Sequence, residues 1–276
     1  TNNPYRDWYL WQNLKPAGWN IYGGDPWRSN ASGGFYFAAF WDQMPDFNLN
    51  NPAVVAWHHD HLRFWMNRGV DGFRIDAVGT LVENGPAAWE NQPQNYSLLR
   101  DLRQRMNDYS RRFLVCEGPS DPGGYTAACG SAFAFNNTAN LLAAARGDAG
   151  AVRAVASYHQ SAPAGISTML SNHDWFAGRR THDQLGGNLA QYKLAAATYL
   201  LQPGTPFIYY GEEIGLAMGP ASMGNDPRLR TPMSWTANTA NAGFTSAIPY
   251  RSLSANVAEH NVAAQAADPN SLLAFY

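Results

Sequence analysis

The sequence predicts an α/β fold built around a parallel sheet. The first observation behind this prediction is that apolar runs with alternating side chains are followed by segments of helical periodicity, and that this order repeats along the chain. The second is the abundance of turn formers, 25 Gly and 17 Pro, which predicts long irregular loops between the ordered elements. Together these patterns indicate one large globular unit with long irregular loops.

Composition excludes several classes of protein. The chain has 276 residues, with 19 Lys and Arg against 21 Asp and Glu, so its formal net charge is −2. Charged residues make up only 14 % of the chain, where soluble domains typically have roughly 25 %. Hydrophobic residues reach 45 %, which excludes a disordered chain, and the charge balance excludes a polycationic nucleic-acid binder. No apolar run approaches the roughly 18 residues of a membrane span, so we expect neither nucleic acid nor membrane as a partner.

Cysteines and histidines give no sign of a metal site. Cys116 and Cys129 are too few for a disulfide scaffold and lack the spacing of a zinc motif, and Cys116 is expected to pack outward against helices. His58, His59 and His61 share one predicted helix without an acidic partner at metal-ligand spacing. We therefore expect no metal ligands and no cofactor, and no residue pattern indicates a structural calcium ion.

Residues 1–50 have no sustained period and are rich in aromatic side chains, which predicts a long surface loop without a core of its own. A helix is expected to begin at Pro52 and to stop at Gly69. Its predicted buried stripe consists of Val54, Trp57, His61, Leu62 and Trp65.

Strands and helices alternate in the rest of the chain. Strands are predicted over 70–78, 112–117, 166–174 and 205–213, with a poorly marked one near 131–135, and helices over 96–110, 149–160 and 188–201. In the first strand, alternation places Phe73, Ile75 and Ala77 on one face. The opposite face carries Arg74, Asp76 and Val78.

Three of these strands end in a carboxylate, namely Asp76, Glu117 and Asp174. Ligand sites of parallel α/β folds form at the carboxyl ends of strands, so three such acids point to a catalytic site. A single one would be explained as a helix cap. Arg74 lies on the same strand face as Asp76, where its guanidinium would keep that carboxylate ionised, as a nucleophile requires.

Short motifs surround the three carboxylates: GFRIDAV at 72–78, VCEG at 115–118 and SNHD at 171–174. They resemble three sequence signatures of the α-amylase superfamily, glycoside hydrolase family 13. Further runs resemble the family in the same order, namely DWYLW at 7–11, PDFNLNNP at 45–52, GTPFIYYGEE at 204–213 and RTPMSW at 230–235. The resemblance implies a (β/α)8 TIM-type barrel that cleaves α-glucosidic bonds with retention of configuration.

The resemblance also assigns roles to residues. Asp76 matches the nucleophile, Glu117 the general acid/base, and Asp174 the third carboxylate, which binds sugar hydroxyls. These residue types suit a retaining glycosidase, which needs one ionised and one protonated carboxyl group about 5–5.5 Å apart. Glu117 would need a less polar or more anionic setting than Asp76 to hold its proton.

Arg74, His173 and Arg230 are expected to bind substrate, since they match residues that flank the carboxylates or belong to the RTPMSW run. That run and DWYLW resemble the α-glucosidase and trehalose synthase branches. We therefore expect hydrolysis of maltose, maltooligosaccharides or related α-glucans. Ala77 follows the expected nucleophile, and in similar α-glucosidases Ala at this place accompanies α-1,4 specificity.

Two alternatives stay open. The same glycosyl-enzyme could pass its sugar to another sugar, as in a transglycosylase or isomerase of the trehalose synthase type. A homologue without catalysis could instead serve as a sugar-binding or partner subunit, because a fold does not guarantee its chemistry. The presence of all three carboxylates favours an enzyme. The sequence gives no basis for assigning a compartment.

We expect the chain to be a fragment. Its only Asn-His pair, Asn172-His173, belongs to the last signature, so the signature of the third barrel strand is missing. Residues 1–50 would then be the loop (B-type) domain inserted after the third strand, and 51–276 a partial barrel of strands four to eight and their helices. Such an open sheet would need a missing N-terminal segment as its partner, and would leave Val78 and Val115 in water.

Overall fold

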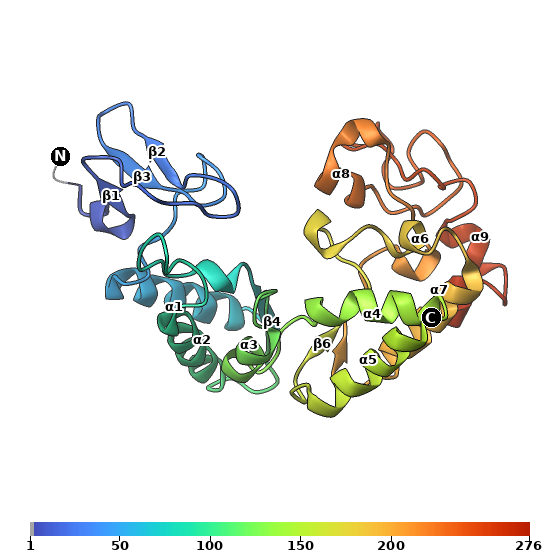
Figure 1. Ribbon diagram of the computed structural model, residues 1–276. Coiled ribbons are helices and arrows are strands. Elements are labelled where there is room, and N and C mark those ends of the chain that lie inside the picture. Colours follow the sequence, from blue (N-terminus) through green and yellow to red (C-terminus); the bar gives the residue numbers. More distant parts are fainter. Residues whose placement is uncertain (1–2) are drawn as a thin grey trace. The chain divides into compact units, whose positions relative to one another are not determined.

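The structure is a computed structural model that describes residues 3–276. It divides into two compact units, Thr1–Ala132 and Phe133–Tyr276, both of which combine helices with parallel strand pairs (Figure 1). The predicted α/β fold is therefore confirmed. The expected division at residue 50 concerns a different boundary and stays a prediction.

Unit 1 begins with a three-stranded antiparallel sheet in the order β1-β3-β2, shown in blue in Figure 1. Its strands are short, and Trp27 of β2 is paired with Phe37 of β3. The prediction that residues 1–50 lack a core is wrong, because Ile21, Trp27, Phe37 and Ala39 form a buried cluster. Strands this short leave no alternating pattern in the sequence. The bounds are β1 Trp11–Gln12, β2 Trp27–Ser29 and β3 Phe35–Phe37, after a 3-10 turn, η1 Arg6–Trp8.

Helix α1 (Pro52–Met66) begins at the predicted proline, where the Asn51 side chain accepts a hydrogen bond from Ala53 N. Its predicted apolar stripe is only partly buried, since Trp57 and Trp65 are 37 % and 49 % exposed. The buried side carries His59 instead, because its Nε2 lies 3.3 Å from Asp101 Oδ2. His59 is not part of the predicted buried stripe, and its ion-pair partner Asp101 accounts for its burial.

The first parallel pair joins β4 (Gly72–Ile75) to β5 (Phe113–Cys116), with Arg74 opposite Val115 and Ile75 opposite Cys116. Helices α2 (Pro93–Met106) and α3 (Pro122–Cys129) pack on this pair. Only glycine fits at position 72, because a Cβ atom there would lie 2.0 Å from the Phe113 carbonyl oxygen. This close approach brings the two strands together just before their functional ends.

Strand β4 is shorter than predicted because Ala77 adopts a left-handed conformation with φ of 43°. This residue reverses the alternation, so Val78 joins the buried cluster that Phe73 and Ile75 contact. The expectation that Val78 shares a face with Arg74 is therefore wrong. Val78 and Val115 are 0 % and 3 % exposed, so the expectation that they lie in water is also wrong. A 3-10 turn, η2 (Val78–Thr80), follows.

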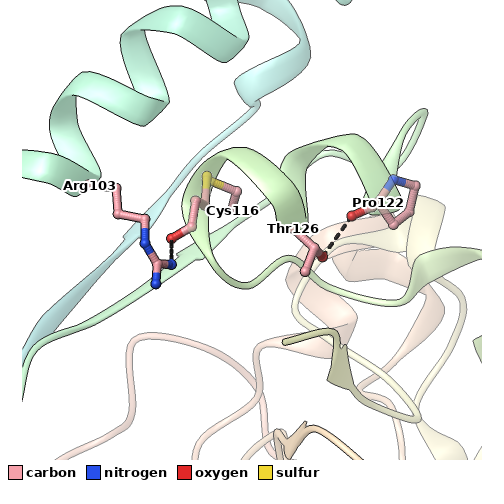
Figure 2. The surroundings of a disulfide bond; sticks show 5 residues. Arg103, Cys116, Pro122 and Thr126 are labelled. Carbon is pink, nitrogen blue, oxygen red and sulfur yellow. Dashed lines mark hydrogen bonds between the residues drawn. A yellow bond between two sulfur atoms is a disulfide. The ribbon is translucent and has the colours of Figure 1, made fainter. Parts of the chain in front are cut away.

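A disulfide bond joins Cys116 at the end of β5 to Cys129 at the end of α3, with Cα atoms 6.3 Å apart (Figure 2). Both cysteines are fully buried, and the Cys129 carbonyl accepts a hydrogen bond from Arg103 of α2. Cys116 does face the helices, as expected, but its pairing was not predicted. The bond fixes the backbone of the residue that directly precedes Glu117.

The weakly marked strand near 131–135 is present as isolated parallel bridges. Ala132 pairs with Cys116 in unit 1, and Phe133 pairs with Ser167 in unit 2. In unit 2, β6 (Ser167–Thr168) pairs in parallel with β7 (Thr205–Pro206). Both strands are much shorter than predicted, because their ladders end at Thr168 and Pro206 although apolar residues follow.

Helices α4 (Phe135–Ala145), α5 (Ala149–Ser161) and α7 (Leu189–Leu200) enclose the main core of unit 2, which includes Leu170 and Tyr199. None of the helices in residues 3–276 is long and apolar enough to cross a membrane. The remaining elements of unit 2 are η3 Trp175–Ala177, α6 Thr181–Gln184, η4 Glu212–Ile214, η5 Ala221–Met223, α8 Asn225–Leu229, α9 Val262–Ala266 and α10 Leu272–Phe275.

A buried carboxylate, Glu212 of η4, joins several elements of unit 2. Its Oε1 accepts hydrogen bonds from Tyr199 OH (2.8 Å) and Tyr276 OH (3.0 Å), and its Oε2 accepts from Ser171 Oγ (3.0 Å) and Thr181 Oγ1 (3.4 Å). Burial raises the pKa of Glu212 from its ordinary value of 4.5 to about 7, although these hydrogen bonds lower it. Between about pH 4.5 and pH 7 the folded chain therefore holds this proton more tightly than the unfolded chain does.

We predict that the double substitution Cys116→Ala/Cys129→Ala lowers the free energy of unfolding by about 3 kcal/mol, the value expected when a cross-link closing a loop of about 15 residues is lost. Urea unfolding of the variant and of the wild type, with and without reductant, measures this. The reduced wild type serves as the matched control and should resemble the variant. Equal stability of the oxidised wild type and the variant would show that the cross-link contributes nothing.

We predict that Glu212→Gln changes how stability depends on pH. Because the pKa of Glu212 is higher in the folded than in the unfolded chain, its protonation stabilises the fold. This contribution is fully present below pH 4.5 and is lost as the pH rises through about 7. The stability difference between wild type and variant should therefore fall between pH 5 and pH 8, by at most about 3 kcal/mol. Glu259→Gln, at an exposed carboxylate, controls for the loss of one negative charge. Parallel pH profiles for wild type and Glu212→Gln would refute this role.

Candidate functional site

The β4–β5 ladder carries Asp76 and Glu117 side by side. Beyond the last register pair, Glu117 N donates a hydrogen bond to the Ile75 carbonyl (2.9 Å), and Val78 N donates to the Glu117 carbonyl (2.9 Å). Asp76 lies between these two bonds on the neighbouring strand end. The structure thus brings together two of the predicted catalytic carboxylates at the carboxyl end of a parallel pair.

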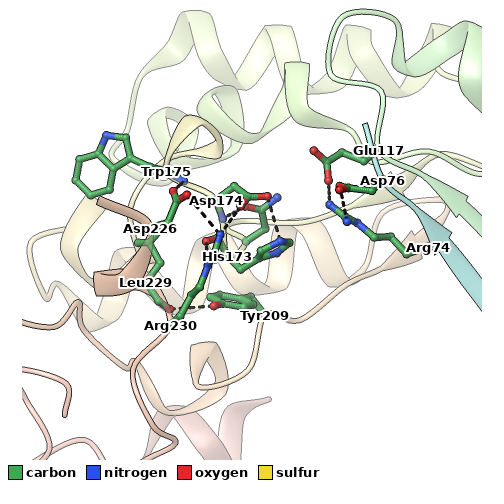
Figure 3. A network of polar contacts seen from close by, with 11 residues as sticks. Arg74, Asp76, Glu117, His173, Asp174, Trp175, Tyr209, Asp226, Leu229 and Arg230 are labelled. Carbon is green, nitrogen blue, oxygen red and sulfur yellow. Dashed lines mark hydrogen bonds and ion pairs between the residues drawn. The ribbon is translucent and has the colours of Figure 1, made fainter. Parts of the chain in front are cut away.

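The Arg74 guanidinium contacts both carboxylates (Figure 3). Its Nη1 lies 2.6 Å from Asp76 Oδ1, and its Nη2 forms an ion pair with Glu117 Oε2. Arg74 lies beside Asp76 as expected, and the strand register also places Glu117 within its reach. Arg74 cannot by itself give the two acids different roles.

Exposure is what distinguishes the two carboxylates. The Asp76 side chain is 70 % exposed, whereas that of Glu117 is 7 % exposed. Asp76 can therefore be approached from solvent, while Glu117 is enclosed by the protein beside the same guanidinium. The same pair thus offers one open carboxylate and one enclosed carboxylate next to a shared positive charge.

The third carboxylate, Asp174, forms a separate cluster within unit 2 with the two substrate-binding candidates (Figure 3). Arg230 Nη2 lies 2.7 Å from Asp174 Oδ1, and His173 Nε2 lies 3.1 Å from Asp174 Oδ2. Arg230 Nε also donates to the His173 carbonyl (2.9 Å). One guanidinium therefore fixes both the carboxylate and the backbone beside it.

Asp174 is not at a strand end, contrary to expectation. Strand β6 stops at Thr168, whose carbonyl accepts the last ladder bond from Phe207 N (2.8 Å). The chain then turns into a loop, where the Asn172 side chain accepts a hydrogen bond from Asp174 N (2.8 Å). A polar loop braced by side chains, rather than a sheet, positions this acid.

Two residues near this cluster were not predicted. Asp226 accepts a hydrogen bond from Trp175 N (2.8 Å), and its Oδ2 lies 3.4 Å from Arg230 Nη2. The i,i+4 spacing of Asp226 and Arg230 was the available signal. Tyr209 lies with its ring centroid 6.5 Å from that of His173, and it belongs to the GTPFIYYGEE run, to which no role was given.

The residues present can supply acids, hydrogen bonds and positive charges, but they show no metal-binding arrangement. Within residues 3–276, no group of three or more His, Cys, Asp or Glu side chains could hold a metal ion. Unit 1 carries Arg74, Asp76 and Glu117, and unit 2 carries His173, Asp174 and Arg230. Each unit thus holds carboxylates paired with an arginine, and such groups can act as acids, bases or nucleophiles.

Comparison with known proteins gives the family. The model of the α-amylase family, described as "Alpha amylase, catalytic domain", matches residues 1–276 of this chain. The chain is 30 % identical to a trehalose synthase/amylase of Mycolicibacterium smegmatis, over 91 % of this chain and 50 % of the relative. It is also 30 % identical to a probable α-glucosidase of Rhizobium meliloti, over 100 % of this chain and 60 % of the relative. The chain thus spans about half the length of these curated relatives.

Solved structures agree with this family. An α-amylase from H. orenii is 28 % identical with a TM-score of 0.77, over 99 % of this chain and 56 % of that one. An α-glucosyl transfer enzyme is 25 % identical with a TM-score of 0.82, over 99 % of this chain and 61 % of that one. The family and fold class predicted from the sequence are therefore confirmed. The chain belongs to the α-amylase family, and its α/β fold is that of the family's catalytic domain.

Proposed function

We propose that the protein hydrolyses α-1,4-glucosidic bonds in maltose and maltooligosaccharides with retention of configuration, through a glycosyl-enzyme intermediate. The observation that carries this proposal is the pair Asp76 and Glu117, held on adjacent strand ends by one guanidinium. Two carboxyl groups that contact one guanidinium suit the separation of about 5–5.5 Å that retaining glycosidases use.

In the proposed first step, an Asp76 oxygen attacks the anomeric carbon and the bond to the leaving oxygen breaks. Glu117 donates its proton to that oxygen, so the leaving sugar departs neutral. In the second step, Glu117 takes a proton from water, whose oxygen attacks the same carbon and releases Asp76. The exposure of Asp76 and the burial of Glu117 suit these roles.

We assign Asp174, with His173, to binding the hydroxyl groups of the sugar. Asp174 is 19 % exposed, and Arg230 and His173 each contact one of its oxygens, leaving further acceptor positions for hydroxyl groups. Arg230 compensates its negative charge, which reduces the cost of holding this carboxylate largely buried. Arg74 is proposed to bind substrate through the charge it shares between Asp76 and Glu117.

Relatives with established names support this proposal and also its alternatives. A salivary α-glucosidase of Anopheles gambiae is 29 % identical over 98 % of this chain and 56 % of its own length. A trehalose synthase of Thermus thermophilus, 28 % identical over 99 % of this chain, favours an isomerase that uses the same intermediate with a sugar as acceptor. Both reactions share the first step, so only the acceptor differs.

A partner subunit without catalysis is the candidate from another class. An amino acid transporter heavy chain of Rattus norvegicus is 30 % identical over 99 % of this chain. Against this alternative, Asp76, Glu117 and Asp174 are all present, and each contacts an arginine. Burying a carboxylate such as Glu117 costs stability, which a purely structural subunit has no reason to retain.

We predict that Asp76→Asn and Glu117→Gln each reduce turnover of an α-glucoside by several orders of magnitude while the fold is kept. Steady-state kinetics on maltose measures this, and NMR of the first product should show the α-anomer, because two displacements retain configuration. Asp71→Asn, at an exposed acid just before β4, is the matched control. Near-native turnover in either variant, or an initial β-product, would contradict the assigned roles.

We also predict that maltose is cleaved faster than isomaltose and that glucose is the main product. Ala77→Val should destabilise the protein and lower its maltose activity, because a β-branched residue is strained at a φ of 43°. Chromatography of the products from maltose and from isomaltose measures the rates and identifies the main product. Thermal unfolding of Ala77→Val measures its loss of stability. Faster cleavage of isomaltose would refute the linkage, and trehalose as the main product would favour the isomerase.

A further inference from the structure

Arg230 lies between two backbone carbonyls that are both held by tyrosine hydroxyls. Tyr209 OH donates to the Leu229 carbonyl (2.9 Å), and Tyr210 OH donates to the Thr231 carbonyl (2.6 Å). These are the residues immediately before and after Arg230. Adjacent tyrosines in the loop after β7 therefore fix the backbone on both sides of the arginine that contacts Asp174.

A buried arginine reinforces both tyrosines. Arg180 is 1 % exposed, and its guanidinium carbon lies 4.4 Å from the ring centroid of Tyr209 and 4.7 Å from that of Tyr210. It donates hydrogen bonds to the Leu229 carbonyl (2.6 Å) and to the Tyr210 carbonyl. The Leu229 carbonyl thus accepts from Tyr209 and Arg180 together. We refer to Arg180, Tyr209 and Tyr210 as the arginine clamp.

These contacts restrict the backbone from which the Arg230 side chain extends. An arginine side chain loses considerable rotamer freedom when it is held in one geometry, and that loss weakens its contacts unless the surroundings already restrict it. The Arg230 side chain is 35 % exposed, so water competes for its donors. A backbone fixed on both sides directs the guanidinium toward Asp174 Oδ1 and the His173 carbonyl.

We propose that Arg180, Tyr209 and Tyr210 are positioning residues that act on Asp174 through Arg230, an inference that rests on the proposed function for its kinetic consequence. The tyrosines contribute hydroxyl groups that donate hydrogen bonds to the backbone. Burial raises the pKa of Tyr209, so its hydroxyl group stays protonated and can donate. None of the clamp residues needs to touch the sugar. Their role is to keep one ion pair in the geometry that substrate binding requires.

The test uses Tyr209→Phe, Tyr210→Phe and the double substitution, which remove only hydroxyl groups. We expect each single variant to lower kcat/KM on maltose about tenfold and the double variant about a hundredfold, as for other small losses of alignment near reacting groups. Tyr158→Phe, on α5, is the matched control and should keep wild-type kinetics. Thermal unfolding of each variant checks that the fold is kept.

A double-mutant cycle separates positioning from general stability. In an Arg230→Met background the tyrosine substitutions should have no further effect on kcat/KM, because their route to Asp174 is gone. An equal loss in both backgrounds would overturn the proposal.

A second readout does not depend on turnover. The Nε–H signal of Arg230, followed by NMR, should exchange slowly in the wild type and faster in the Tyr209→Phe/Tyr210→Phe variant. An unchanged exchange rate would overturn the clamp even if the enzyme is active. A wild type without activity on any α-glucoside would instead overturn the proposed function, while the exchange rates would still decide the clamp.

Discussion

The shared ion pair of Arg74 with Asp76 and Glu117 is the constraint on which the candidate site of unit 1 depends. It requires the parallel register that sets Arg74 opposite Val115 and brings Glu117 level with the end of β4. A slip of one residue would turn one of the two carboxylates to the other face. The close approach at Gly72, the left-handed Ala77 and the disulfide at Cys116 each fix a part of this short ladder.

In unit 2, the candidate site residue Asp174 is positioned without a strand. Asp174 lies in a loop, so its position depends on side chains from other segments rather than on a ladder. Arg230 holds it directly, and the arginine clamp holds Arg230. Glu212 joins the segment that precedes Asp174 to α6, α7 and Tyr276 through hydroxyl groups. The loop that carries Asp174 is therefore braced by a polar network in which Arg180 and Glu212 are buried.

Much of the unit 1 site could be predicted from the sequence, because it follows from local patterns. Alternation along β4 places Arg74 and Asp76 together, and the repeat of strand and helix puts Glu117 on the neighbouring strand end. The place where alternation stops could not be predicted. Ala77 reverses it through a left-handed backbone, and an alanine gives no sign of that conformation in the sequence.

The other features that the sequence did not predict depend on contacts between segments that are distant along the chain. Cys116 and Cys129 meet only because α3 returns to β5, and that helix was not predicted. The early aromatic cluster around Phe37 depends on strands too short to show a period. The donors to the carbonyls beside Arg230 come from residues well before it in the chain. Family resemblance located the motif that contains these tyrosines, but only the structure shows what their hydroxyl groups contact.

The central claim is that Asp76 forms a covalent bond to the sugar. A fluorinated α-glucosyl fluoride, which forms the glycosyl-enzyme quickly and releases it slowly, can trap that species. Peptide mapping by mass spectrometry then locates the attached sugar. The account predicts an ester on Asp76 in the wild type and none in the Asp76→Asn variant. A sugar attached to Glu117 or to any other residue, or a protein that turns the substrate over without an adduct on Asp76, would contradict it.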